Sequence, residues 1–264
     1  NNASDFGVRA LNNSSAVNDG HIQNVGDHGM AAFSGSSVEN GASGVIENTG
    51  SAGMYVEENG SSAVNRGTIH NGDTFGMWIS QGTGENYGTI KNNSTYGMLA
   101  SDNGSGYNYG LIQNMGDYGM WSQSGATIVN QVGGVIQNTG NNGMNVSGTG
   151  SILTTGINQG LIANTGEQGM SSTGINGSII NNGTIKNLSD YGMLAVNNSS
   201  AINEGHIQNT GNIGMAGSSG SSVENKENGI IENTGFVGML AEENGSTVVN
   251  RGLIANGGMY GIWV

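Results

Sequence analysis

An eleven-residue phrase recurs along the chain: residues 20–30 read GHIQNVGDHGM, residues 205–215 read GHIQNTGNIGM, and looser copies lie between them. The glycine of each Gly-Met pair, or its equivalent, returns at intervals of 21 to 26 residues, and the twelve positions span 254 residues in eleven steps, a mean of 23. These glycines are Gly7, Gly29, Gly53, Gly76, Gly97, Gly119, Gly143, Gly169, Gly192, Gly214, Gly238 and Gly261. A fixed period of this length is typical of solenoids and related repeat architectures, so the repeat constrains the fold more than any other feature.

A larger repeat is superimposed on the short one. A shift of 185 residues places 6–79 onto 191–264 without a gap, and 46 of the 74 paired positions are identical. Eight units of about 23 residues make up this distance, so an eight-coil block begins a second time within the chain. We interpret 1–264 as a single solenoid segment and expect it to be part of a longer protein.

Each unit holds three short extended segments separated by Gly, Asn and Ser turns, which leaves no room for a helix. In the I-x-N segment the isoleucine is kept, whereas the next position varies through Gln, Glu, His, Lys and Ala. A kept apolar residue beside a variable polar one has the two-residue period of a β-strand. The sequence therefore predicts an all-β fold: a parallel β-helix of about twelve coils of about 23 residues, with three short strands per coil. Left-handed solenoids follow a stricter six-residue rhythm, so the variable coil length favours the right-handed form.

The kept residues also predict the interior. Ile, Met and the Val of the third segment are expected to stack in columns inside the coils, as in other solenoids. The Asn of I-x-N lies on the same side as its Ile, where stacked amides can bond along the axis. The Gly before Met is expected to form a tight corner that a Cβ would block.

Composition excludes several functions. The net charge is −13, from six Lys and Arg against nineteen Asp and Glu, so neither nucleic acid nor an anionic membrane surface is an expected partner. No stretch approaches the roughly 18 apolar residues of a spanning helix, so no membrane insertion of this segment is expected. The absence of Cys excludes a disulfide scaffold and thiol chemistry, and it suits a chain exported through an oxidising periplasm.

The titratable residues do not form a recognisable reaction centre. The glutamate pairs at 57–58 and 242–243 are equivalent under the 185-residue shift, and we interpret them as solvated turns rather than a calcium site or an acid–base pair. His21 and His206 are also equivalent and are expected to point outward from strands, without metal-ligand spacing. We therefore predict no catalytic residues, no cofactor and no metal site.

The position after Met is the more informative one. If Met points inward its successor points outward, and this position holds Tyr55, Trp78, Leu99 and Trp121 in four consecutive units. On a solenoid these side chains would form one exposed ladder with a spacing of about 4.8 Å. An apolar ridge on a polar rod predicts a contact surface, and aromatic rings suit sugar stacking or protein hot spots. The alternative is that the ladder is packed against neighbouring side chains or another part of the parent chain.

The unit as a whole resembles a known family. NRGTIHNGDTFGM (65–77) and NNGTIKNLSDYGM (181–193) are similar to the passenger repeats of large type V autotransporter adhesins, in particular those of fusobacteria and their relatives, and the resemblance covers the whole chain. It implies a long right-handed β-helix on the bacterial surface, tethered to the outer membrane by a C-terminal β-barrel outside this chain. It further implies attachment to host cells through receptors or glycans, or to partner bacteria, by a monomeric rod that is not an enzyme.

Two other functions are weighed against the adhesin. A β-helix polysaccharide lyase or hydrolase, including the tailspike type, needs clustered Asp or Glu with Arg or Lys on one face of adjacent coils, whereas the charges here are scattered along the sequence. Ice binding needs flat threonine ladders; Thr68 and Thr89 share a position, but Leu111 and Val135 interrupt the row. The leading prediction is therefore an extracellular rod segment of a surface adhesin.

Overall fold

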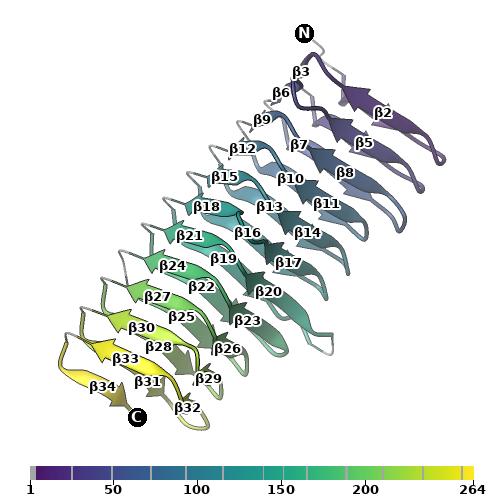
Figure 1. The fold of residues 1–264 in the computed structure, drawn as a ribbon. Helices are drawn as coiled ribbons and strands as arrows, with labels where there is room; N and C mark the ends of the chain where they lie inside the picture. Colours follow the sequence, from purple (N-terminus) through teal and green to yellow (C-terminus); the bar gives the residue numbers. More distant parts are fainter. Residues whose placement is uncertain are drawn as a thin grey trace.

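The three extended segments of each unit are β-strands that stack on their counterparts in the next unit. In the computed structural model, residues 4–24, 26–48, 50–71, 73–92, 94–114, 116–138, 140–150, 152–164, 166–187, 190–209, 211–233, 235–256 and 258–264 are described. They form 34 strands in three parallel sheets, and none of these residues is helical. Figure 1 shows the sheets running along one rod, with the two chain ends at its opposite ends. The fold is an all-β parallel solenoid, which confirms the predicted class.

The first sheet contains twelve strands and includes the Gly-Met segments. Its strands are β1 (Phe6–Ala10), β4 (His28–Ala32), β7 (Ala52–Glu57), β10 (Phe75–Ser80), β13 (Tyr96–Ser101), β16 (Tyr118–Gln123), β19 (Asn142–Ser147), β22 (Gln168–Thr173), β25 (Tyr191–Val196), β28 (Ile213–Ser218), β31 (Val237–Glu242) and β34 (Tyr260–Trp263). Met77 aligns with Met54 on one side and Met98 on the other, and all three are fully buried. The methionines therefore form a central column of the core, as predicted.

The second sheet contains eleven strands, each ending in Asn. Its strands are β2 (Ser15–Asn18), β5 (Ser37–Asn40), β8 (Ser62–Asn65), β11 (Thr83–Asn86), β14 (Ser105–Asn108), β17 (Thr127–Asn130), β20 (Thr154–Asn158), β23 (Gly177–Asn181), β26 (Ser200–Asn203), β29 (Ser222–Asn225) and β32 (Thr247–Asn250). The prediction that the Val of this segment lies inside is wrong: Val17 is 62% exposed. The terminal Asn takes the inward position, so strand alternation turns the preceding Val outward.

The third sheet contains eleven strands and includes the I-x-N segments. Its strands are β3 (His21–Asn24), β6 (Val45–Asn48), β9 (Thr68–Asn71), β12 (Thr89–Asn92), β15 (Leu111–Asn114), β18 (Val135–Asn138), β21 (Leu161–Asn164), β24 (Thr184–Asn187), β27 (His206–Asn209), β30 (Ile230–Asn233) and β33 (Leu253–Asn256). Ile46, Ile69 and Ile90 are aligned and fully buried. One continuous core cluster thus combines these isoleucines with the methionines of the first sheet.

Two ladders of stacked asparagine side chains run along the axis of the core. The inward Asn of the second sheet forms a ladder in which each side-chain amide donates to the carbonyl oxygen of the next, at 2.7 to 2.9 Å, from Asn18 to Asn250. In the predicted I-x-N ladder, Asn48 donates to Asn71 at 3.2 Å. The other side chains of that column lie outside the described part of the chain. Buried amides are therefore paired along the axis, which satisfies groups that would otherwise be costly to bury.

Candidate functional site

The structure brings the four residues of the predicted ladder into register. Tyr55 on β7 aligns with Trp78 on β10, Trp78 with Leu99 on β13, and Leu99 with Trp121 on β16. The column continues in both directions, to Ala31 on β4 and to Asn145 on β19. The prediction of a single ladder on neighbouring strands is confirmed.

The predicted exposure of this ladder is wrong. Tyr55 is only 8% exposed and Leu99 only 4%, while Trp78 and Trp121 are half-buried. The cause is a second column of side chains on the same outer side. The rings of Phe75 and Trp78, three positions apart on one strand, lie 5.0 Å apart between centroids. The packing alternative therefore applies to Tyr55 and Leu99, while Trp78 and Trp121 remain partly accessible.

The second column arises from a break in strand alternation at Gly-Met. A Cβ on Gly76 would meet the side chain of the fully buried Ile90 on β12, so Gly76 faces inward, as the following Met77 also does. Two successive inward positions shift the preceding residue, Phe75, to the outer side, because strict alternation would have turned it inward. Strict alternation through Gly-Met would place Phe75 inside, so the sequence alone did not predict this column.

Together the two columns and the adjoining ring of Phe33, which follows β4, form an aromatic strip on the outer side of the first sheet. We use this name for the rings of Phe6, Phe33, Tyr55, Phe75, Trp78, Tyr96, Tyr118 and Trp121. Phe75 stacks on Tyr96 at 5.1 Å, and Tyr96 stacks on Trp121 at 4.8 Å. Offset stacking at such distances stabilises aromatic pairs beyond the area they bury. The rings therefore hold one another in place.

Polar residues end the strip on the C-terminal side. On β19 and β22 the two columns carry Asn142, Asn145 and Ser171, which are buried. Ser171 accepts a hydrogen bond from Asn142 at 2.8 Å and donates to Asn145 at 2.5 Å. Beyond this interruption the same face carries a smaller cluster built on Ile213 and Leu240. The strip is thus a bounded surface over β1 to β16.

Carboxylates line both margins of the strip. The turns that precede its strands carry Asp5, Asp27, Asp73 and Asp117. At the other ends of the strands, Glu57 is the last residue of β7, Glu58 follows it, and Asp102 follows β13. Burial raises the pKa of Tyr55, with a further contribution from the Glu57 carboxylate. Burial also raises the pKa of Tyr96 to about 12, assisted by Tyr118 and Asp117. The strip is therefore a neutral aromatic surface in a negative field.

We expect the fold to lose stability between about pH 10 and pH 12. The pKa of Tyr96 rises from 10.0 to about 12 on folding; its contribution is complete below pH 10 and is lost as the pH rises through the folded value, because the unfolded chain then ionises first. Ultraviolet titration of phenolate together with circular dichroism measures this. Tyr96→Phe, which places in β13 the residue that β10 carries as Phe75, should shift the alkaline midpoint upward. Titration of every tyrosine near its ordinary pKa would contradict the expectation.

The paired glutamates at 57–58 and 242–243 include one residue each that accepts a hydrogen bond from the preceding coil. Glu58 lies in a turn with φ of 72° and accepts a hydrogen bond from Ser34 at 2.9 Å in the preceding coil. Its equivalent, Glu243, has φ of 66° and accepts a bond from Ser219. The interpretation of 57–58 and 242–243 as turns is therefore confirmed for Glu58 and Glu243 only, because Glu57 and Glu242 are the last residues of β7 and β31. Among the described residues, no group of three His, Cys, Asp or Glu is placed to hold a metal ion.

The two outward histidines also repeat one contact. His21 lies 3.1 Å from the Glu47 carboxylate, and His206 lies 3.1 Å from that of Glu232. Both pairs lie on the outer face of the third sheet, so the outward position predicted for these histidines is confirmed. The threonine row is interrupted as predicted, since Thr89 aligns with Leu111.

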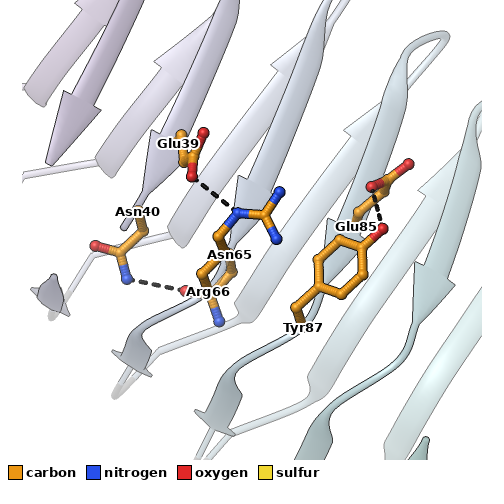
Figure 2. A network of polar contacts seen from close by, with 6 residues as sticks. All are labelled: Glu39, Asn40, Asn65, Arg66, Glu85 and Tyr87. Atoms are coloured by element: carbon orange, nitrogen blue, oxygen red, sulfur yellow. Dashed lines mark hydrogen bonds and ion pairs between the residues drawn. The ribbon is translucent and has the colours of Figure 1, made fainter. Parts of the chain in front are cut away.

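A polar network at the turn between the second and third sheets was not predicted (Figure 2). Arg66 donates to Glu39 at 2.9 Å, and its guanidinium carbon lies 4.8 Å from the ring centroid of Tyr87. Tyr87 donates to Glu85 at 3.0 Å and stacks on exposed Tyr109 at 4.5 Å. The repeated N-Y-G at 86–88 and 108–110 is the sequence signal that could have revealed it.

The charges are also less scattered than the sequence suggested. Under the 185-residue shift, Glu39 and Arg66 correspond to Glu224 and Arg251, which again form an ion pair. Lys226 lies 3.4 Å from Glu224 as well. A surface hollow of ≈ 540 Å³ is lined by Glu224, Lys226 and Arg251 together with Glu204 and Glu227. Adjacent coils therefore do bring carboxylates and cations together, contrary to expectation.

Comparison with models of protein families, with curated proteins and with solved structures gave no match. None of the described residues belongs to a helix that is long and apolar enough to cross a membrane. The chain's class therefore follows from its own coils: a parallel β-solenoid whose first sheet carries a bounded aromatic strip with acidic margins.

Proposed function

We propose that this chain is an extracellular rod segment of a bacterial surface adhesin of the autotransporter-passenger type. In this proposal it is a monomeric, right-handed β-helix of about twelve coils and not an enzyme, and it attaches to a host-cell receptor or glycan or to a partner bacterium. The single observation that supports attachment is the aromatic strip. Its large half-buried rings lie on the outside of a polar, acidic rod and take no part in the core beneath them, which is typical of a contact surface. Half-buried aromatic residues of this kind dominate the energetics of protein and sugar contacts.

The tryptophans of the strip are expected to carry attachment. The double variant Trp78→Leu with Trp121→Leu should lower attachment of beads coated with the full chain to cells at least about tenfold, as loss of hot-spot rings does. Leucine is chosen because Leu99, Leu194 and Leu240 occupy the same position in other coils, so the solenoid tolerates it. Bead counts on a panel of epithelial and bacterial cells measure the effect.

The matched control for this variant is Tyr87→Leu with Tyr109→Leu, which removes two exposed rings from a different face. Attachment should be unchanged in the control, and circular dichroism should show both variants folded. Equal attachment by the tryptophan variant and the parent chain would eliminate the strip as the contact.

A second candidate, cleavage of a polysaccharide, is favoured by the hollow lined by Glu204, Glu224 and Glu227 with Lys226 and Arg251. Carboxylates beside cations on adjacent coils are the arrangement that such an enzyme requires. Incubation of the chain with a panel of polysaccharides separates the two candidates. Release of reducing or unsaturated sugar that is lost in Glu224→Gln would establish the enzyme and overturn the purely adhesive proposal.

A further inference from the structure

The aromatic strip already binds one cation, and that cation belongs to the chain itself. The guanidinium carbon of Arg9 lies 4.9 Å from the ring centroid of Phe6 and 4.9 Å from that of Phe33. Arg9 aligns with Ala31, which aligns with Tyr55, so it occupies the column of the strip's tryptophans. The surface therefore accommodates a guanidinium between its rings in the folded state.

The remaining positive charges of the chain lie on other faces. Arg66, Lys226 and Arg251 follow strands of the second sheet, and Lys91 and Lys186 lie on strands of the third. Within the described residues, Arg9 is thus the one Lys or Arg on strands of the first sheet. Apart from Arg9, the described strands of the first sheet therefore carry no Lys or Arg to oppose the carboxylates at the margins of the strip. The strip combines π-faces with negative charge along its length over β1 to β16.

We propose that the aromatic strip binds an arginine-containing basic segment of a partner protein. The inference rests on the proposed attachment function and names the chemical class of its partner. A guanidinium stacks on an aromatic face and offers paired donors to a carboxylate; the strip presents both groups within one surface. Charge complementarity favours this partner over a neutral sugar. A sugar would stack on the rings but would make no ion pair with the acidic margins.

Tryptophan fluorescence reports on this face alone. The chain has three tryptophans, and Trp78, Trp121 and Trp263 all occupy the outward column of the first sheet. Titration of the full chain with an octa-arginine peptide should change this fluorescence and give saturable binding that weakens as salt rises. A cationic quencher should also quench the tryptophans more strongly than an anionic one, because the margins concentrate cations.

Two double variants separate the rings from the charges. Trp78→Leu with Trp121→Leu should lower the affinity for octa-arginine about tenfold by removing the stacking faces. Asp73→Asn with Asp102→Asn removes one exposed carboxylate from each margin and should lower it about five- to tenfold. Binding to the tryptophan variant is followed by a label on the peptide.

The charge control is Glu47→Gln with Glu232→Gln, which removes two charges from the third sheet and leaves the strip untouched. Affinity close to that of the parent chain supports the inference, whereas a loss equal to that of Asp73→Asn with Asp102→Asn would show general attraction to an acidic rod and overturn it. Displacement of the peptide by a neutral oligosaccharide at equal concentration would assign the strip to a sugar instead.

Cell attachment distinguishes this inference from the function on which it rests. If free octa-arginine blocks attachment of coated beads, both the adhesive function and the basic partner are supported. If the tryptophan variant loses attachment but octa-arginine neither binds nor blocks, attachment stands and the basic partner is wrong. If octa-arginine binds through the strip but coated beads attach to no cell, the partner chemistry stands and the adhesive role fails.

Discussion

Replacing Gly119 with alanine is expected to lower the free energy of unfolding by about 3 kcal/mol, the upper part of the range for overpacking. A Cβ at this position would lie 2.5 Å from the carbonyl oxygen of Gly143 and still closer to Cγ2 of Ile136. The carbonyl belongs to β19, which is paired with β16 along its length, so neither backbone can move away without loss of ladder hydrogen bonds. Ile136 is fully buried and packed in the core.

Gly261→Ala is the matched control, because the same column ends there. No atom lies within 4 Å of a Cβ at Gly261, so this variant should change stability by less than about 0.5 kcal/mol. Urea unfolding followed by circular dichroism gives the midpoint and slope for both. A similar small effect at both positions would show that the coils separate easily, and the close-approach explanation for the Gly-Met pair would then be incorrect.

The repeat predicted the parts of the fold that every coil shares. Ile46, Met54 and their equivalents lie where a kept apolar residue in a strand must lie, because the solenoid gives each unit the same environment. The register of Tyr55 with Trp78 followed from the same reasoning. Equal spacing along the sequence becomes alignment across strands, so the columns could be read without any structure.

The sequence could not predict where alternation breaks. The inward turn of Gly76 depends on packing against other strands, since Ile90 on β12 and the carbonyl oxygen of Gly97 in the next coil both lie against it. The same break places Phe75 against Trp78 and His28 against Tyr55, the latter pair at 4.6 Å between ring centroids. The exposure of the candidate site therefore depended on packing between strands and not on the pattern of one strand. The pairing of Glu39 with Arg66 likewise joins residues of adjacent coils at a turn, where local pattern carries little information.

Contacts between coils also decide which residue is buried at the end of the second-sheet strands, Val or the Asn that follows it. An isolated strand would bury Val17 and expose Asn18 on hydrophobicity alone. In the solenoid, Asn18 donates to Asn40 in the next coil at 2.8 Å, so the amide is satisfied inside while Val17 remains outside. The buried ladder is therefore a property of stacked coils, and its energetic contribution can be tested at one rung.

Asn108→Ala is expected to lower the free energy of unfolding by about 3 kcal/mol. Asn108 accepts from Asn86 at 2.8 Å and donates to Asn130 at 2.8 Å, and all three side chains are fully buried. Alanine would leave the Nδ2 of Asn86 and the Oδ1 of Asn130 short of one partner each; an unsatisfied buried polar group costs about 1–3 kcal/mol. The lost packing volume adds to this cost.

Asn250→Ala serves as the control, since it removes the same amide from the last rung, which is exposed and has one ladder neighbour, Asn225. It should cost less than about 1 kcal/mol, because water replaces the lost partner. Hydrogen exchange measured by mass spectrometry adds a spatial test: in Asn108→Ala, protection should fall most in β11, β14 and β17, because solenoid coils contact only their neighbours. Equal losses of stability at Asn108 and Asn250, or a loss of protection spread evenly along the rod, would mean that the ladder does not hold adjacent coils together.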